Sequence, residues 1–219
     1  MKLPTIIVNF KTYEGATGER ALLLARIHEK VVYDTGVSIA IAVQPTDISL
    51  LASEVKIPVF AQHVDPIVYG ASTGFILPEA AAAAGAYGTL LNHAEHQIAD
   101  DVLEKSVEAA KRAGLYTVLC ANTPEKGAEI AKFEPDLIAV EPPELIGGDI
   151  SVSTASPEII TKSVELIGPD KVLVGAGVKT GEDVKIAVEL GAKGVLLASG
   201  ITKASDPEKV LRELVSSIL

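Results

Sequence analysis

The sequence predicts a single-domain α/β fold, a (β/α)8 barrel in which eight parallel strands alternate with helices. Eight short β-branched and apolar runs recur along the 219 residues. Most are apolar without interruption, as parallel strands buried on both faces require. The expected strands are 5–9, 37–43, 57–62, 88–92, 115–120, 137–141, 171–175 and 193–197. Because no linker or break in composition divides them, one domain over residues 1–219 is expected.

Helical patterns with recognisable start signals separate these runs. Residues 180–183 have the sequence of a capping box, and Ser156 and Asp206 each precede a proline, as N-cap residues often do. Apolar spacing or alanine content indicates further helices over 20–32, 80–84 and 101–113. The alternative is an open doubly wound sheet, but no G-x-G-x-x-G motif follows the first strand.

Composition and charge narrow the class of partner. The net charge of −10 would repel nucleic acid, although a small phosphate ester can still bind through local N–H groups and a lysine. Cys120 is the only cysteine, so no disulfide within the chain is expected, and it is interpreted as a small core residue. The N-terminal apolar run is too short for a signal peptide, and no run approaches the roughly 18 residues of a membrane helix. A cytoplasmic protein is expected.

Polar residues end the first and fourth predicted strands, where the active site of a barrel lies. Alternation along a strand places Asn9 and Lys11 on the same side, with Phe10 opposite. His93 closes the fourth strand and is either a structural or a catalytic residue. His93 with His96, or His63 with Asp65, could also belong to a metal site, but neither pair forms a specific motif.

The segment AVEPPELIGG, residues 139–148, combines a stiff acid with a segment that can move. Pro142 favours an extended backbone at Glu141, which ends the sixth strand. Apolar residues followed by Gly147 and Gly148 have the composition of a loop that can close over a site. An ordinary turn with a solvated glutamate is the alternative.

The last two strands end in small residues. Gly175-Ala176-Gly177 follows the seventh strand and Ala198-Ser199-Gly200 follows the eighth. Barrels often bind phosphate with these two loops, because backbone N–H groups there can approach an anion closely. The pair of loops therefore predicts a phosphate site.

The whole sequence resembles the triosephosphate isomerase family in its short archaeal form. Six segments match the family in order: VNFKTY at 8–13, FAQHVDP at 60–66, GTLLNHAE at 88–95, AVEPPELIGG at 139–148, GAGVKTGEDV at 175–184 and GVLLASG at 194–200. The resemblance implies a barrel enzyme of glycolysis and gluconeogenesis that interconverts dihydroxyacetone phosphate and D-glyceraldehyde 3-phosphate through an enediol, with neither cofactor nor metal.

The resemblance also implies roles for individual residues. Glu141 is the base, His93 the electrophile, and Lys11 and Asn9 bind substrate; the family is the usual example of a glutamate base paired with a neutral histidine. Residues 142–148 form the closing lid. The positions that contact phosphate are Ile146, Gly147, Gly177, Ala198 and Ser199, with Gly200 adjoining them.

The sequence departs from the family in two places. The family usually has serine after the catalytic histidine, where it partners the glutamate when the lid is open; here the residue is Ala94, so an altered position or pKa of Glu141 is expected. Glu95 is retained, and we expect it to order Lys11 or nearby loops. Phe75 replaces a polar residue of the third loop, which affects the expected subunit contacts of residues 65–75.

Two other functions fit parts of the sequence. A phosphosugar epimerase or aldolase would share the phosphate loops but needs metal ligands or a Schiff-base lysine elsewhere. A non-catalytic phosphometabolite-binding barrel would be free to lose Lys11, His93 or Glu141, and all three are present. The resemblance implies a homo-oligomer, with a tetramer favoured over a dimer, and neither nucleic acid nor a membrane as partner.

Overall fold

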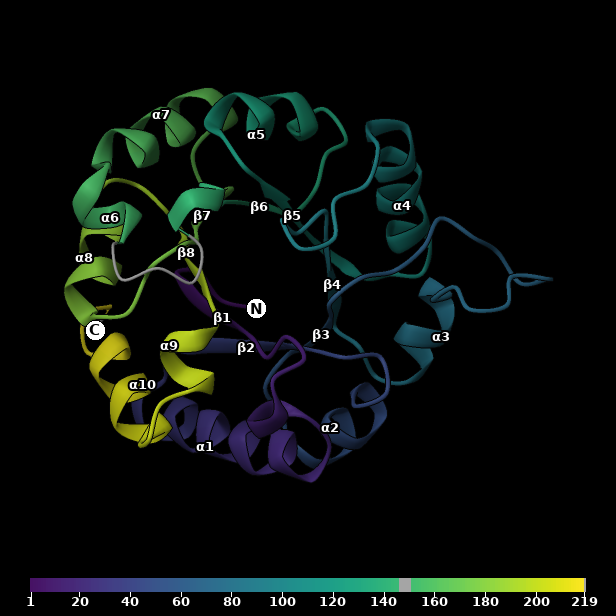
Figure 1. Cartoon of the computed structure of the whole chain (residues 1–219), viewed down its shortest axis with the longest axis horizontal. Coiled ribbons are helices and arrows are strands. Elements are labelled where there is room, and N and C mark those ends of the chain that lie inside the picture. Colours follow the sequence, from purple (N-terminus) through teal and green to yellow (C-terminus); the bar gives the residue numbers. More distant parts are fainter. Residues whose placement is uncertain (146–150, 219) are drawn as a thin grey trace.

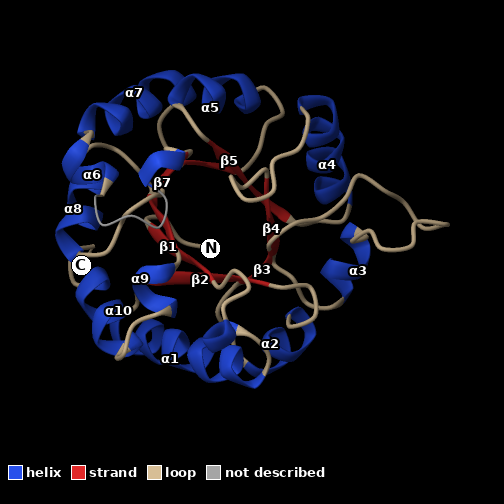
Figure 2. Ribbon diagram, viewed as in Figure 1, coloured by secondary structure: helices blue, strands red, loops and turns tan. Residues whose placement is uncertain are grey.

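Eight parallel strands close into a barrel in sequence order, with helices around it (Figures 1 and 2). The computed structural model describes residues 1–145 and 151–218. The strands are β1 (Thr5–Asn9), β2 (Ser38–Val43), β3 (Val59–Ala61), β4 (Gly88–Leu91), β5 (Tyr116–Ala121), β6 (Leu137–Val140), β7 (Val172–Val174) and β8 (Gly194–Leu197). Each of the eight predicted runs contains one of these strands or overlaps most of it, so the prediction is confirmed.

Pairing between the first and last strands excludes an open sheet. β1 pairs with β2 on one side, and on the other side it pairs with β8, where Thr5 lies opposite Gly194 and Val8 opposite Leu197. The barrel prediction is therefore confirmed and the open-sheet alternative is wrong.

The strands bury both of their faces, which explains why their sequences are continuously apolar. One face fills the barrel interior with a cluster that includes Ile7, Leu90 and Leu173. The other face packs against the helices in a larger cluster that includes Ile6 and Val8. Alternate residues of one strand thus belong to two different cores.

Helices follow the strands and form the outer layer (Figure 2). They are α1 (Glu19–Thr35), α2 (Ile48–Glu54), α3 (Pro78–Ala83), α4 (Asp100–Arg112), α5 (Pro124–Ala131), α6 (Val152–Ala155), α7 (Pro157–Ile167), α8 (Gly181–Glu189), α9 (Ser199–Thr202) and α10 (Pro207–Val215), with 3-10 turns η1 (Glu14–Ala16) and η2 (Pro143–Leu145). In the described ranges, no helix has the length and apolar character needed to cross a membrane.

Two of the three predicted helix starts have the expected side-chain caps. Thr180 and Asp183 form a reciprocal capping box at α8, and the Asp206 carboxylate accepts a hydrogen bond from the Lys209 N–H at α10. Ser156 lies at the N-cap of α7 but its side chain makes no cap hydrogen bond. Ser156 also ends α6, and its backbone N–H donates to the Val152 carbonyl, so the residue joins two helices rather than capping one with its side chain.

Candidate active site

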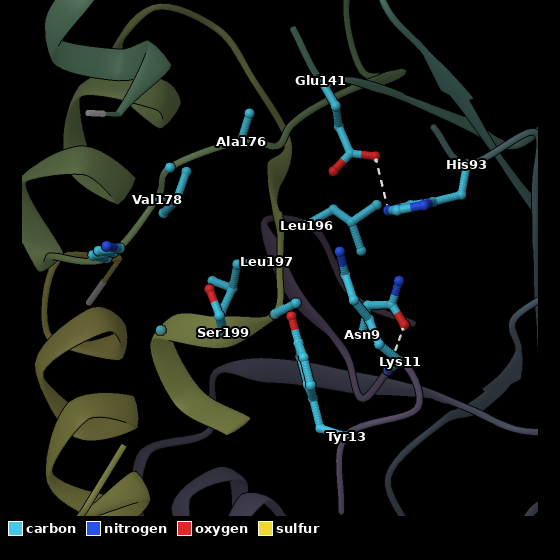
Figure 3. A pocket seen from close by; sticks show the side chains of 14 residues that line it. Asn9, Lys11, Tyr13, His93, Glu141, Ala176, Val178, Leu196, Leu197 and Ser199 are labelled. Atoms are coloured by element: carbon cyan, nitrogen blue, oxygen red, sulfur yellow. Dashed lines mark hydrogen bonds and ion pairs between the residues drawn. The ribbon is translucent and has the colours of Figure 1, made fainter. Parts of the chain in front are cut away.

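A small pocket lies at the carboxyl ends of the strands and collects most of the predicted site residues (Figure 3). Of the predicted set, it is lined by Asn9, Lys11, His93, Glu141, Gly177, Ala198, Ser199 and Gly200. Ile146 and Gly147, together with most of the glycine-rich part of the predicted lid, fall outside the described residues.

Lys11 reaches the pocket through a left-handed turn rather than along a strand. β1 ends at Asn9, and Lys11 has a φ of 50°. Alternation along an extended strand predicted Lys11 beside Asn9, and the two residues do lie together, but the strand ends before Lys11. The ammonium of Lys11 lies 2.7 Å from the Glu95 carboxylate, and the side chain is 12% exposed. Glu95 therefore contacts Lys11, as its expected role in ordering Lys11 or nearby loops requires.

His93 is held in a defined orientation by the backbone that follows it. Its Nδ1 atom accepts a hydrogen bond from the Glu95 N–H at 3.1 Å. Burial and the nearby Lys11 ammonium lower the pKa of His93, while Glu95 opposes them. In the neutral ring the proton therefore resides on Nε2, which faces the Glu141 carboxylate at 3.8 Å.

Glu141 is a buried carboxylate with an oxygen left free. Its backbone N–H continues the ladder to the Ala121 carbonyl, so the residue is fixed at the end of β6. The residue is 5% exposed, and its Oε2 atom has no hydrogen-bond partner among the described residues. Burial raises the pKa of Glu141 from 4.5 to about 7, against the effects of the Cys120 thiol and Lys11. A carboxylate with this pKa can both accept and return a proton near neutral pH.

Glycine at position 175 makes room for this carboxylate. A Cβ atom at Gly175 would lie 2.3 Å from Cγ and 2.5 Å from Oε1 of Glu141. The Gly175 N–H also donates a backbone hydrogen bond to the Val140 carbonyl. Because the backbones of Gly175 and Glu141 are both held by hydrogen bonds to neighbouring strands, neither can easily move away from the other. The sequence identified Gly175 only as part of a phosphate loop.

We expect Glu141→Gln to stabilise the protein in a pH-dependent way. A raised folded-state pKa favours folding below pH 4.5, and this contribution is lost as the pH rises through 7. Above pH 7 the wild type thus folds with a buried anion, which costs up to about 3 kcal/mol.

Urea unfolding at pH 5, 6, 7 and 8 measures this effect. The free energy of unfolding of the variant should exceed that of the wild type most at pH 8, with the difference shrinking towards pH 5. A difference that is equal at all four pH values would contradict the buried-anion account.

The opposite end of the pocket is built from small residues and free backbone. Ala176 and Gly177 both have a φ of 71°, which turns the loop after β7 towards the loop after β8. Ala198 precedes the short helix α9, whose first N–H groups have no partner within the helix. Ser199 and Gly200 from this turn line the pocket, so backbone donors are available to an anion.

The histidine pairs considered as metal ligands form a different arrangement. The ring of His63 stacks on that of His96 with centroids 4.4 Å apart, and His63 Nε2 lies 3.2 Å from an Asp65 oxygen. Across residues 1–145 and 151–218, no group of three or more His, Cys, Asp or Glu side chains is placed to hold a metal ion.

Comparison with known proteins identifies the family. The sequence model of the triosephosphate isomerase family matches residues 4–217. The chain belongs to this family. A triosephosphate isomerase of Methanobacterium bryantii is 50% identical over 98% of this chain and 97% of its own. The one of Methanothermus fervidus is 46% identical over the full length of both chains.

A solved structure supports the fold independently. The crystal structure of triosephosphate isomerase from Bartonella henselae superposes with a TM-score of 0.75 over 95% of this chain and 97% of its own, at 20% identity. The likeness at this identity concerns the fold. The family resemblance stated from six sequence segments is confirmed.

Several pocket residues of this triosephosphate isomerase family member were missed from the sequence. Tyr13, Val178 and Leu196 line the pocket, but apolar and aromatic residues give no signal that separates them from the core. Gln62 contacts both Asn9 and Lys11. It is the last residue of the third predicted strand and follows the observed β3, and this position at a strand end was the available signal.

Proposed function

We propose that this protein is an active triosephosphate isomerase, which interconverts dihydroxyacetone phosphate and D-glyceraldehyde 3-phosphate. The observation that supports it best is the buried Glu141 carboxylate, whose Oε2 atom has no hydrogen-bond partner among the described residues, in one pocket with Lys11 and the Nε2 atom of His93. The relatives named triosephosphate isomerase cover nearly the whole chain. A Schiff-base aldolase or metal-dependent epimerase has no comparable support.

The reaction moves one proton between adjacent carbons. In the proposal, Glu141 takes the carbon-bound proton, the C–H electron pair forms the C=C bond, and the carbonyl π pair moves onto its oxygen to give an enediolate. A proton then passes from the hydroxyl of one carbon to the oxygen of the other, a transfer that His93 Nε2–H can serve, and Glu141 returns its proton to the neighbouring carbon as the new carbonyl forms. Its pKa of about 7 suits a group that must act as base and then as acid. The acid itself is unchanged after each turnover, so neither cofactor nor co-reactant is required.

Negative charge develops on the substrate oxygens during this transfer. We assign its stabilisation to the Nε2–H of neutral His93 and to the Lys11 ammonium, both fixed by contacts with Glu95. These contacts hold the donors in place before substrate arrives, so little reorganisation is needed.

The phosphate is proposed to lie at the far end of the pocket, on the backbone of Gly177, Ala198 and Ser199. Binding energy gained there positions the reacting carbons against Glu141. Ile146 and Gly147 complete this set in the proposal, within a lid of residues 142–148 that closes to exclude water.

A coupled assay tests the proposal. Purified wild type should convert D-glyceraldehyde 3-phosphate rapidly, and Glu141→Gln should not. Binding of 2-phosphoglycolate, a phosphorylated mimic of the enediolate, without turnover by the wild type would instead identify a non-catalytic phosphometabolite-binding barrel.

Ala94→Ser is expected to change the pH dependence of this activity. A serine hydroxyl next to His93 can donate a hydrogen bond to the carboxylate, which stabilises its ionised form and lowers the pKa of Glu141. The acidic limb of the kcat/KM profile should therefore move to lower pH. Superimposable profiles for the wild type and the variant would contradict the proposed effect of Ala94.

We also propose that the protein is a homo-oligomer, with a tetramer favoured over a dimer. The loop between β3 and α3 projects from the barrel (Figure 1) and exposes Val68, Tyr69 and Phe75 by 62%, 76% and 59%. Such apolar side chains on a projecting loop suit a subunit contact.

Light scattering after size exclusion should give the mass of four chains for the wild type and a smaller mass for Phe75→Asp. A monomeric wild type would overturn the proposal.

We further propose that the chain acts as one barrel domain in the cytoplasm, where its soluble phosphorylated substrates would be used.

A further inference from the structure

Lys11 has a backbone conformation that its own sequence does not favour. Its φ of 50° lies in the left-handed region, which a residue other than glycine, asparagine or aspartate seldom occupies. Such a conformation persists only when its surroundings enforce it. Because this turn directs the ammonium into the pocket, whatever enforces it also sets the position of the charge.

Gln62 makes the contacts that can enforce the turn. It follows β3, two strands away from β1 in the barrel, and is half-buried. Its amide nitrogen lies 2.9 Å from the Lys11 carbonyl oxygen, 3.2 Å from Asn9 Oδ1 and 3.3 Å from the Ala42 carbonyl oxygen. Since all three neighbours are acceptors, the amide must present its N–H groups to them.

The same contacts orient Asn9. Its Oδ1 atom accepts from the Lys11 N–H at 3.0 Å as well as from Gln62. With the oxygen satisfied by two donors, the Nδ2 group remains to face the pocket, where Figure 3 shows Asn9 beside Lys11. One glutamine thereby fixes both a cationic and a neutral donor.

We propose that Gln62 is a positioning residue for the substrate-binding pair Lys11 and Asn9, acting by holding the left-handed Lys11 backbone and the Asn9 amide in one arrangement. The inference rests on the proposed function, because it assumes that Lys11 and Asn9 bind the substrate. Gln62 itself need not touch the substrate.

Glutamine suits this place by length and by hydrogen-bonding type. Methionine has nearly the same length and can fill the same space but donates no hydrogen bond. Glutamate keeps the shape, but its ionised carboxylate faces the same three acceptors and is repelled by them. Both variants thus remove the donors while keeping the volume.

Steady-state kinetics of Gln62→Met and Gln62→Glu form the first test. We expect kcat/KM to fall about 10- to 100-fold, because an ångström-scale displacement of a charged group has effects of this size. Because the Lys11 ammonium lowers the pKa of Glu141, its displacement away from the pocket in Gln62→Met should move the acidic limb of the profile to higher pH. Thermal melts and circular dichroism verify that each variant is folded.

Gln44→Met is the matched control. Gln44 follows β2 as Gln62 follows β3, it is also half-buried, and its amide donates to the Thr17 hydroxyl at 3.1 Å, outside the pocket. Its kcat/KM should stay within twofold of wild type. An equal loss in both methionine variants would assign the effect to general disturbance of the strand ends and overturn the proposal.

A double-mutant cycle shows whether Gln62 acts through Lys11. Dissociation constants for 2-phosphoglycolate are measured by calorimetry for the wild type, Gln62→Met, Lys11→Met and the double variant. Gln62→Met should weaken binding several-fold in the wild type and by a clearly smaller factor once Lys11 is replaced, the remainder acting through Asn9. The same factor in both backgrounds would show that Gln62 acts independently of Lys11, contrary to the proposal.

The proposed function and the positioning role of Gln62 can be refuted separately. A wild type without isomerase turnover refutes the proposed function, while the binding cycle still tests the link between Gln62 and Lys11. Wild-type turnover with less than a twofold effect of a folded Gln62→Met refutes the positioning role alone.

Discussion

Glu141→Gln is expected to lower kcat by about 10²- to 10⁴-fold, the range typical for removal of a general base. The amide has nearly the shape of the carboxylate and can occupy the space beside Gly175, but it cannot accept the proton from carbon. The fold should be kept, and the substrate should still bind because its phosphate contacts lie at the other end of the pocket.

Glu104→Gln, an exposed change on α4, provides the control and should leave kcat unchanged. The measurement is the coupled assay at substrate concentrations well above KM. Retention of more than a tenth of the wild-type rate by Glu141→Gln would reject Glu141 as the base.

Gly175→Ala is expected to cause the second largest loss, about 100-fold in kcat/KM. The added Cβ atom would overlap the side chain of Glu141, so the carboxylate must leave its place between the strand ends. Gly175 is not among the residues with positive φ, and an alanine backbone is therefore allowed there. Any effect must come from the steric contact, and about 1–3 kcal/mol of stability should be lost with it.

Gly15→Ala separates this contact from a general effect of replacing glycine. Gly15 also lacks a positive φ, and its Cβ would meet only one atom, at an ordinary 3.7 Å. It should leave both activity and unfolding unchanged. If Gly175→Ala kept its kcat/KM within threefold of wild type, the close fit of Glu141 against Gly175 would have no functional importance.

The barrel could be predicted because strands buried on both faces are continuously apolar, and such runs are easily recognised in the sequence. Continuous runs such as 5–9 and 137–141 contain a residue for each core at alternate positions, and their ends were identified within one or two residues for most strands. Strand ends in turn indicated Asn9, His93 and Glu141. The brief helices α6 and α9 were not predicted, since four residues are too few for a periodic pattern.

The details of the site depend on contacts between strands, which a linear reading does not contain. The left-handed turn at Lys11 contacts Asn9 of its own strand and Gln62 from the end of β3, whereas the sequence predicted an extended backbone. The close fit between Gly175 and Glu141 joins residues at the ends of β7 and β6. From the sequence, Gly175 was assigned only to a phosphate loop and Glu141 only to proton transfer, so nothing indicated their contact. Ser156 had the sequence of a cap, yet its position between two consecutive helices left its hydroxyl unused.

The pairing of β1 with β8 has a consequence for how the protein is made. The strand that ends in Asn9 is translated before the other seven strands of the barrel, yet it gains its second neighbour only when residues 194–197 have been translated. A nascent chain on the ribosome that stops before β8 would already contain Lys11, His93 and Glu141 but would lack the loop with Ser199. Closing so long a loop is slow. Until β8 is made, one edge of β1 therefore stays unpaired in the partly synthesised chain. Catalytic activity should then appear in one late step, when β8 and the loop after it are complete, and should not increase gradually with chain length.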